Sequence, residues 1–242
     1  MTSPQTPSIL VSWMLKNDPA CSLCGERGTL RHILAGCSVS LAQGRYRWRH
    51  DCVLRELAAA LEQERRAKHK PRKEGLVFID FVKAGQKGQS QKGGGPTGLL
   101  GRGQWDMLVD LDKKLVFPPN VTTTELRPDI VLWSETERQV AMVELTVPWE
   151  ERVEEAHHMK MSKYTNLQEE CVRKGWKTWV MPVEMGCRGF PARSMWRALQ
   201  MIGVTGQRRR RAMQSMIQAT EKASCWLWMR RDEKAWHFGG AD

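Results

Sequence analysis

The chain of 242 residues carries a formal net charge of +11 at pH 7, and such an excess favours an anionic partner, most often nucleic acid. It contains no run of about eighteen apolar residues, which argues against a membrane span and against a membrane partner. The first residues also lack the basic stretch of a secretion signal, so we expect the cysteines to be reduced.

A cysteine–histidine cluster dominates residues 1–45, which we predict to form a small zinc knuckle region. Its spacing is C-x2-C-x7-H-x4-C, and its members are Cys21, Cys24, His32 and Cys37. Two thiolates separated by two residues can reach one ion from a tight turn, and the later pair can complete a tetrahedral structural Zn²⁺ site. The alternative is three unrelated buried thiols and a surface histidine. The other four cysteines lack such spacing and are expected to be small core residues.

Residues 46–83 are predicted to lead into the main domain as a helix followed by a strand. Apolar residues recur at helical spacing from Tyr46 to about residue 70, and residues 76–82 (LVFIDFV) are typical of a strand. Residues 84–104 are rich in glycine and contain basic residues but no acid, which predicts a flexible loop. A loop of this length favours either disorder or contact with a substrate.

Residues 105–206 alternate between strand-like and helix-like segments and are predicted to form an α/β core. Residues 207–242 are predicted to form a basic C-terminal helix and tail. Strands are expected at 105–111, 127–133, 140–147 and 177–185, and helices at 150–173, 191–202 and 207–229.

An acid lies inside the strand VAMVELTV. Glu144 is surrounded by apolar neighbours in the chain, and burying a carboxylate without a partner is unfavourable. Asp129 begins the preceding strand, and a short turn joins the two strands, so we expect the carboxylates to be neighbours. Adjacent carboxylates repel unless a cation lies between them, and Mg²⁺ or Mn²⁺ binds such groups together with phosphate oxygens. The alternative is a structural ion pair of Glu144 with Arg127 or a lysine.

The helix after this strand carries two lysines toward its apolar face. Lys160 falls at the centre of the inward stripe and Lys163 at its edge, at about 100° per residue. Lysines at core-facing positions need anions, and the strand with Glu144 should pack beside this helix. The alternative is that both side chains extend outward to solvent. His157 and His158 fall on the outward face and are predicted to be surface residues.

Together, these groups predict hydrolysis of a phosphodiester. A metal ion held by Asp129 and Glu144 polarises a phosphate and lowers the pKa of a bound water, and a lysine orients that water or stabilises developing charge. The sequence contains no Ser/His/Asp or Cys/His triad that we can recognise and no phosphate-binding loop.

Four consecutive arginines begin the last predicted helix, after a turn between Gly203 and Gly206. We predict that they contact nucleic-acid phosphates; the alternatives are a solvated helix face or a nuclear localisation signal. We predict a nuclear location. The four residues are Arg208, Arg209, Arg210 and Arg211.

Three motifs in this order, RPDIV (127–131), ELTVPWE (144–150) and KMSKY (160–164), resemble the restriction-like endonuclease domain of site-specific non-LTR retrotransposons. That domain belongs to the PD-(D/E)xK nuclease superfamily and follows a cysteine–histidine knuckle. The segments GRYRWRHDCVL and PVEMGCRGF are also similar to parts of these elements. The resemblance spans about residues 13–206. It implies a restriction-endonuclease-like mixed β-sheet flanked by helices and preceded by a CCHC zinc-binding unit.

The resemblance also implies roles for individual residues. Asp129 and Glu144 match the metal-binding acids, and Lys160 and Lys163 match lysines on the helix. Tyr164 matches a tyrosine beside them, and Arg127 and Thr146 are further candidates to line the site. Thr146 stands where the superfamily usually has a lysine. The implied activity is Mg²⁺-dependent nicking of one DNA strand.

Elements of this kind carry a reverse transcriptase before the knuckle, whereas this sequence has no YxDD-type motif and no room for such a domain. We therefore expect a separated fragment or a host gene derived from an element. Element RNA and a reverse transcriptase acting in trans are further candidate partners. The alternative functions are a DNA-binding module without catalysis and the inert product of a decayed element. The intact acids and lysines favour retained chemistry, because no requirement of the fold explains all four.

Overall fold

The computed structural model describes residues 20–69, 98–111 and 113–236. The first 19 residues, the strand predicted at 76–82 and most of the glycine-rich segment 84–104 lie outside the described residues. Within the described ranges, no helix combines the length and the apolar character needed to cross a membrane.

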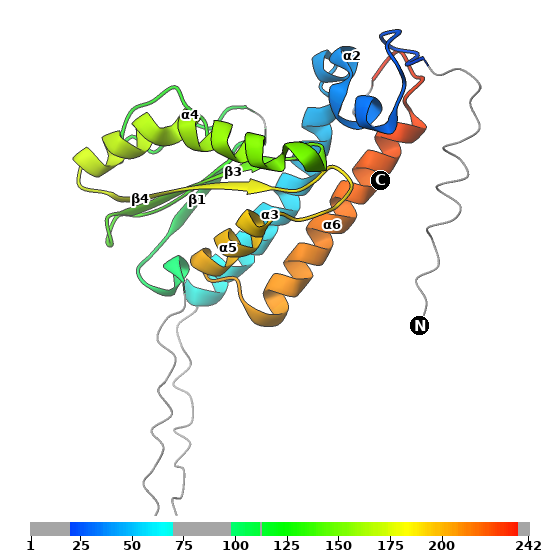
Figure 1. Ribbon diagram of the computed structural model, residues 1–242. Coiled ribbons are helices and arrows are strands. Elements are labelled where there is room, and N and C mark those ends of the chain that lie inside the picture. Colours follow the sequence, from blue (N-terminus) through cyan, green and yellow to red (C-terminus); the bar gives the residue numbers. More distant parts are fainter. Residues whose placement is uncertain (1–19, 70–97, 112, 237–242) are drawn as a thin grey trace, which may run out of the picture.

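A four-stranded mixed sheet forms the centre of the main domain, in the order β1-β2-β3-β4 (Figure 1). β1 (Asp106–Val109), β2 (Ile130–Ser134) and β3 (Gln139–Thr146) are successively antiparallel, whereas β3 and β4 (Lys177–Glu184) run parallel. A helix connects the parallel pair, because a parallel connection must return across the sheet.

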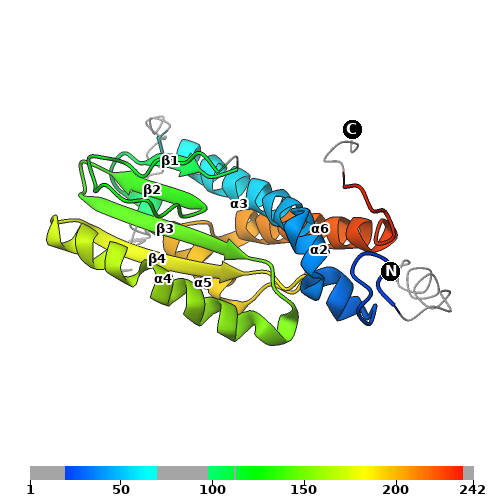
Figure 2. The same ribbon diagram turned by 90° about the horizontal axis from the view of Figure 1, so that it is seen from above.

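Helices cover both faces of this sheet. α4 (Val153–Arg173), which follows the one-turn helix η3 (Glu150–Arg152), lies on one face. α3 (Arg45–His69), α5 (Arg193–Ile202) and α6 (Gly206–Met229) lie on the other face (Figures 1 and 2). The predicted α/β architecture is confirmed, and the strands and helices expected after residue 105 are present with ends shifted by up to three residues.

The alternation of side chains along β3 divides the core into two parts. Ala141, Val143 and Leu145 pack toward α3, α5 and α6, whereas Val140 and Met142 pack toward α4. All five are buried, as expected for a central strand covered on both faces. Because side chains alternate, Glu144 lies on the α4 side.

The long helices α3 and α6 lie side by side and share the core of the sheet. Leu54, Leu57 and Leu61 form the buried face of α3, at the helical spacing seen in the sequence. Met213 and Met216 of α6 belong to the same apolar cluster. Segments on both sides of residues 105–206 therefore complete this core.

The cysteine-rich segment forms a small unit where α3 begins and α6 ends (Figure 1). It contains the π-helical turn η1 (His32–Gly36) and α2 (Ser38–Ala42). Trp228 of α6 completes its apolar core, and Ser22 donates a hydrogen bond to Asp232 at 2.6 Å. These contacts fix the knuckle to the C-terminal end of α6.

Candidate functional site

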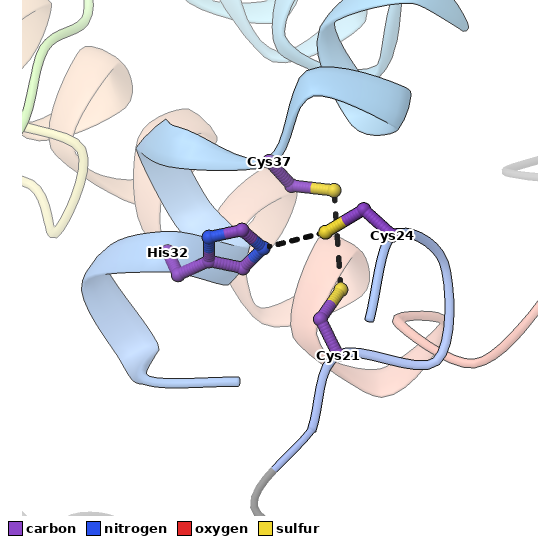
Figure 3. A group of neighbouring side chains, drawn as sticks. All are labelled: Cys21, Cys24, His32 and Cys37. Carbon is purple, nitrogen blue, oxygen red and sulfur yellow. Dashed lines mark hydrogen bonds between the residues drawn. The ribbon is translucent and has the colours of Figure 1, made fainter. Parts of the chain in front are cut away.

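The predicted cysteine–histidine cluster is assembled in the structure. Its four side chains point toward one another (Figure 3), and their donor atoms all lie within 4.8 Å of each other. The distances are 3.1 Å from Cys24 Sγ to His32 Nε2 and 3.9 Å from Cys21 Sγ to Cys37 Sγ. Sulfur ligands of tetrahedral Zn²⁺ are about 3.8 Å apart, given Zn–S bonds of about 2.3 Å. The cluster is therefore a candidate structural zinc site.

The local backbone explains how the ligands converge. The N–H of Cys21 donates to the carbonyl of Glu26, and the N–H of Gly25 donates to the carbonyl of Cys21, which closes the first turn. Gly25 has φ +81°, a conformation that glycine adopts without strain. Burial and the neighbouring thiols raise the pKa of Cys24 to about 11. For Cys37 burial also opposes ionisation, but hydrogen bonds from Ser40 outweigh it and lower the pKa of this thiol. A lowered pKa favours the thiolate that a metal requires.

The second group of functional side chains lies where β2 begins and β3 nears its end. The antiparallel register pairs Ile130 with Val143 and so sets Asp129 opposite Glu144. The N–H of Asp129 donates to Glu144 Oε2 at 3.1 Å, and the N–H of Leu145 donates to Asp129 Oδ2 at 2.8 Å. The two acids are buried, being 6% and 4% exposed, as the apolar strand predicted.

Two lysines and a tyrosine of α4 meet Glu144. Lys160 Nζ lies 2.6 Å and Lys163 Nζ 3.4 Å from Glu144 Oε1. The buried hydroxyl of Tyr164 lies 2.8 Å from Glu144 Oε2, and Lys163 donates to it at 2.9 Å. Burial, together with the carboxylates of Glu144 and Asp129, raises the pKa of Tyr164 far above its ordinary value. We call Asp129, Glu144, Lys160, Lys163 and Tyr164 the β3 cluster.

His50 contacts the β3 cluster through Asp129, although no sequence motif singled this histidine out. Its Nε2 lies 3.2 Å from Asp129 Oδ2, and its Nδ1 lies 2.9 Å from Asp51 Oδ1. Burial opposes protonation of the imidazole, but the two carboxylates outweigh burial and raise the pKa of His50 to about 9. A signal was present, because His50 precedes Leu54 by four residues and so continues the buried stripe of α3.

Asp110 is a second residue that the sequence analysis missed. It is buried, and the register of β1 with β2 sets it opposite Asp129. Its Oδ1 accepts a hydrogen bond from the N–H of Leu115 at 3.1 Å. Three acids therefore stand in a row across β1, β2 and β3. Among the residues that the structure describes, only the cysteine–histidine cluster brings three or more potential metal ligands within 4.8 Å.

Arg127 and Thr146 border the β3 cluster in different ways. Arg127 contributes its main-chain carbonyl, 3.1 Å from the Tyr164 hydroxyl, while its exposed guanidinium donates to the carbonyl of Lys113. The alternative ion pair with Glu144 is thus made by the lysines and not by Arg127. Thr146 lies beside Glu184 in the parallel register, and its Oγ1 is buried without a hydrogen-bond partner in the described structure.

The prediction that His157 is a surface residue is confirmed only in part. Its side chain is 37% exposed, and its Nδ1 lies 3.0 Å from Oε1 of Glu184, which is 1% exposed. Ser194 at the start of α5 also donates to Glu184. The pattern of α4 alone gave no sign of this acid, because Glu184 lies on another element, at the end of β4. His158 is exposed, as predicted.

The four arginines lie in the first turns of α6. Arg208 pairs with Glu64 at 2.8 Å, and Arg209 lies 3.2 Å from Gln200 and over the ring of Trp196. Arg210 and Arg211 are exposed. Because the N-terminal end of a helix dipole is positive, clustered cations there are unfavourable unless anions approach them.

No protein-family model matches the chain, and no curated protein matches it. What the structure establishes is a mixed α/β domain with a four-stranded sheet flanked by helices and a Cys3His cluster that can bind a metal ion. Cys171 and Cys187 are fully buried, in agreement with their predicted core role, whereas Cys52 and Cys225 are half-buried.

Proposed function

We propose that this protein is a metal-dependent DNA endonuclease that nicks one strand and that it derives from a non-LTR retrotransposon. The observation that carries the proposal is the contact of the buried acids Asp129 and Glu144 with two lysines and a tyrosine of α4. Five polar side chains from two strand ends and one helix are not needed for packing, since apolar residues of similar volume stabilise such positions at least as well.

The donor set of the β3 cluster fits a hard divalent cation. Mg²⁺ and Mn²⁺ favour oxygen ligands, and Mg²⁺ typically takes one or two carboxylates together with waters and phosphate oxygens. Asp129 and Glu144 offer two such carboxylates from adjacent strands. When bound, such an ion supplies Lewis-acid activation of the phosphodiester and of a water.

The side chains of the chain itself orient the acids and provide positive charge. Lys160 holds Oε1 of Glu144, while Tyr164 and the N–H of Asp129 hold Oε2, so this carboxylate has one orientation. Lys163 is 42% exposed and makes the longer contact, which leaves it able to turn toward a phosphate oxygen. A cation at that place stabilises the negative charge that develops during hydrolysis.

DNA as the substrate is supported by charge. The net charge of +11 and the exposed Arg210 and Arg211 provide sequence-independent attraction for phosphates. Nuclear location, element RNA and a reverse transcriptase in trans are parts of the same proposal. A structural Zn²⁺ in the knuckle completes it.

A DNA-binding protein without catalysis is the second candidate. The observation that favours it is the 2.6 Å ion pair between Lys160 and Glu144, which neutralises a buried acid without any metal ion. The two candidates predict the same affinity for DNA and differ only in hydrolysis.

Nicking of supercoiled plasmid in Mg²⁺ or Mn²⁺ separates the candidates. The purified chain should convert plasmid to the open-circular form, and Asp129→Asn and Lys160→Met should each abolish this activity. Glu169→Gln and Lys222→Met change exposed residues outside the β3 cluster and serve as matched controls. Metal-dependent nicking no greater than that of the two cluster variants would leave only the binding function.

A further inference from the structure

A cavity of about 320 Å³ lies between the zinc knuckle, the start of α4 and the end of β3. The knuckle contributes Arg31, Ala35 and Gly36, and α3 contributes Tyr46 and Arg49. Ligand pockets in proteins measure roughly 300–1,000 Å³, so this cavity suits a group of about the size of one nucleotide.

Arg49 gives this cavity a buried positive charge that has no ion-pair partner among the described residues. The residue is 1% exposed, and its guanidinium donates to the carbonyl of Leu34 at 2.8 Å, the carbonyl of Val147 at 3.1 Å and the hydroxyl of Ser224 at 3.3 Å. All three acceptors are neutral, and Arg49 Nε has no partner within the described residues.

Glu150 is the acid that acts electrostatically on Arg49, but its carboxylate is already bound by the N–H and side chain of Arg188. A buried guanidinium remains charged, and it is unfavourable without an anion. The cavity beside Arg49 is therefore a place where an anionic ligand stabilises the protein.

The remaining lining supplies the other contacts that a nucleotide needs. Thr146 Oγ1 and Trp149 Nε1 are buried polar atoms without partners in the described part of the chain. Pro148, Trp149 and Met159 provide an apolar surface for a planar base. At the rim, Arg152 is paired with Glu155, so the unmatched charge of the cavity comes chiefly from Arg49.

Two elements, β3 and α3, contribute residues both to the cavity lining and to the surroundings of the β3 cluster. Thr146 lies two residues beyond Glu144 on β3, and side chains two apart in a strand share one face. Arg49 precedes His50, whose imidazole contacts Asp129. A chain of DNA with one phosphate at the acids can therefore place a neighbouring nucleotide at the cavity.

We propose that this cavity binds one unpaired nucleotide beside the phosphodiester that is cut, with its phosphate paired to Arg49 and its base against Trp149 and Pro148. The identity of the ligand as part of a DNA strand rests on the proposed endonuclease function. The zinc knuckle then forms one wall of a substrate site in addition to stabilising the fold.

Isothermal titration calorimetry on the full zinc-loaded chain tests this, with thymidine 5′-monophosphate, thymidine and inorganic phosphate as probes. The nucleotide should bind more tightly than either of its parts. Thr146→Val removes a hydroxyl that bonds nothing in the described structure, so the fold should persist while nucleotide affinity falls by about five-fold.

Met159→Glu places an acid at the rim and should weaken nucleotide binding by about ten-fold. Val172→Glu is the matched control, because Val172 is on the same helix, outside the cavity lining, and is 54% exposed against 55% for Met159. Its nucleotide affinity should equal that of the wild type.

Three outcomes overturn the nucleotide site: no saturable binding, equal affinity for nucleotide and inorganic phosphate, or affinity unchanged in both Thr146→Val and Met159→Glu. Plasmid nicking, measured in parallel, keeps the two proposals apart. Nicking without nucleotide binding overturns only the cavity, whereas cavity-dependent binding without nicking supports the cavity and overturns the endonuclease.

Discussion

The backbone N–H of Asp129 donates a hydrogen bond to Oε2 of Glu144 at 3.1 Å. This bond joins the main chain just before β2 to a carboxylate near the end of β3. Because the donor is a backbone group, replacing the side chain of Asp129 leaves it in place. Loss of nicking in Asp129→Asn would therefore report on the missing charge of Asp129 and not on displacement of Glu144.

A double-mutant cycle should detect the coupling between Glu144 and Lys160. Either Glu144→Leu or Lys160→Met alone leaves a buried or half-buried charge without its main partner, which should lower the free energy of unfolding by about 1–3 kcal/mol. The double variant should lose less than the sum of the two, because it removes both charges. Urea unfolding of the four proteins measures this, and strictly additive losses would show that the pair contributes no coupling.

The zinc knuckle should contain about one equivalent of Zn²⁺ per chain, measured by metal analysis. Cys21→Ser should lose the metal and lower the melting temperature, because the cluster is the centre of the small core that includes Trp228. Cys225→Ser changes a half-buried cysteine outside the cluster and should keep both properties. A folded wild-type protein that contains no zinc would contradict the assignment.

The free energy of unfolding at acidic pH should depend on the ionisation of Glu62. Hydrogen bonds from Arg65, opposed by burial and aided by Arg66, lower the pKa of Glu62 from 4.5 to about 2. A depressed pKa contributes stability above pH 4.5 that is lost as pH falls toward 2. Because Arg66 is well exposed, we expect Glu62→Gln to cost at most about 1 kcal/mol at pH 7. The difference from wild type, measured by urea unfolding, should shrink below pH 4.5; a constant difference would argue against this pair.

The helices and strands of this fold could be predicted from the periodic spacing of apolar residues in the sequence. The inward positions of Lys160 and Glu144 in the β3 cluster could be predicted as well. The helical stripe of α4 predicted that Lys160 points inward, and the apolar neighbours of Glu144 predicted its burial, because both signals lie within one segment. His50 and Asp110 contact or face Asp129 across large separations in the chain, and neither has an unusual local pattern. Their roles become visible only when the strand register and the packing of α3 are known.

The role of Arg49 in the cavity also could not be predicted from the sequence. In the sequence, Arg49 is one basic residue among many in a positively charged chain. Its three neutral acceptors lie in η1, just after β3 and in α6, and it has no ion-pair partner among the described residues. The contact of His157 was missed for the related reason that its partner, Glu184, lies on another element, at the end of β4. The spacing of residues within one helix or strand predicts which way a side chain points. Whether that side chain is buried depends on the residues of other elements that pack against it.

The arginines of α6 should differ in their effect on DNA affinity. Arg210 and Arg211 are exposed, so replacing both by Ala should weaken binding and reduce the salt slope by about two, since each phosphate contact contributes about 0.9. Arg208 is tied to Glu64, so Arg208→Ala should have a smaller effect on the slope and should destabilise the contact between α3 and α6. Fluorescence anisotropy of a labelled duplex between about 50 and 200 mM salt measures the slopes. Arg173→Ala, at the exposed end of α4, is the control, and an equal loss in that variant would show that the effect comes from net charge and not from α6.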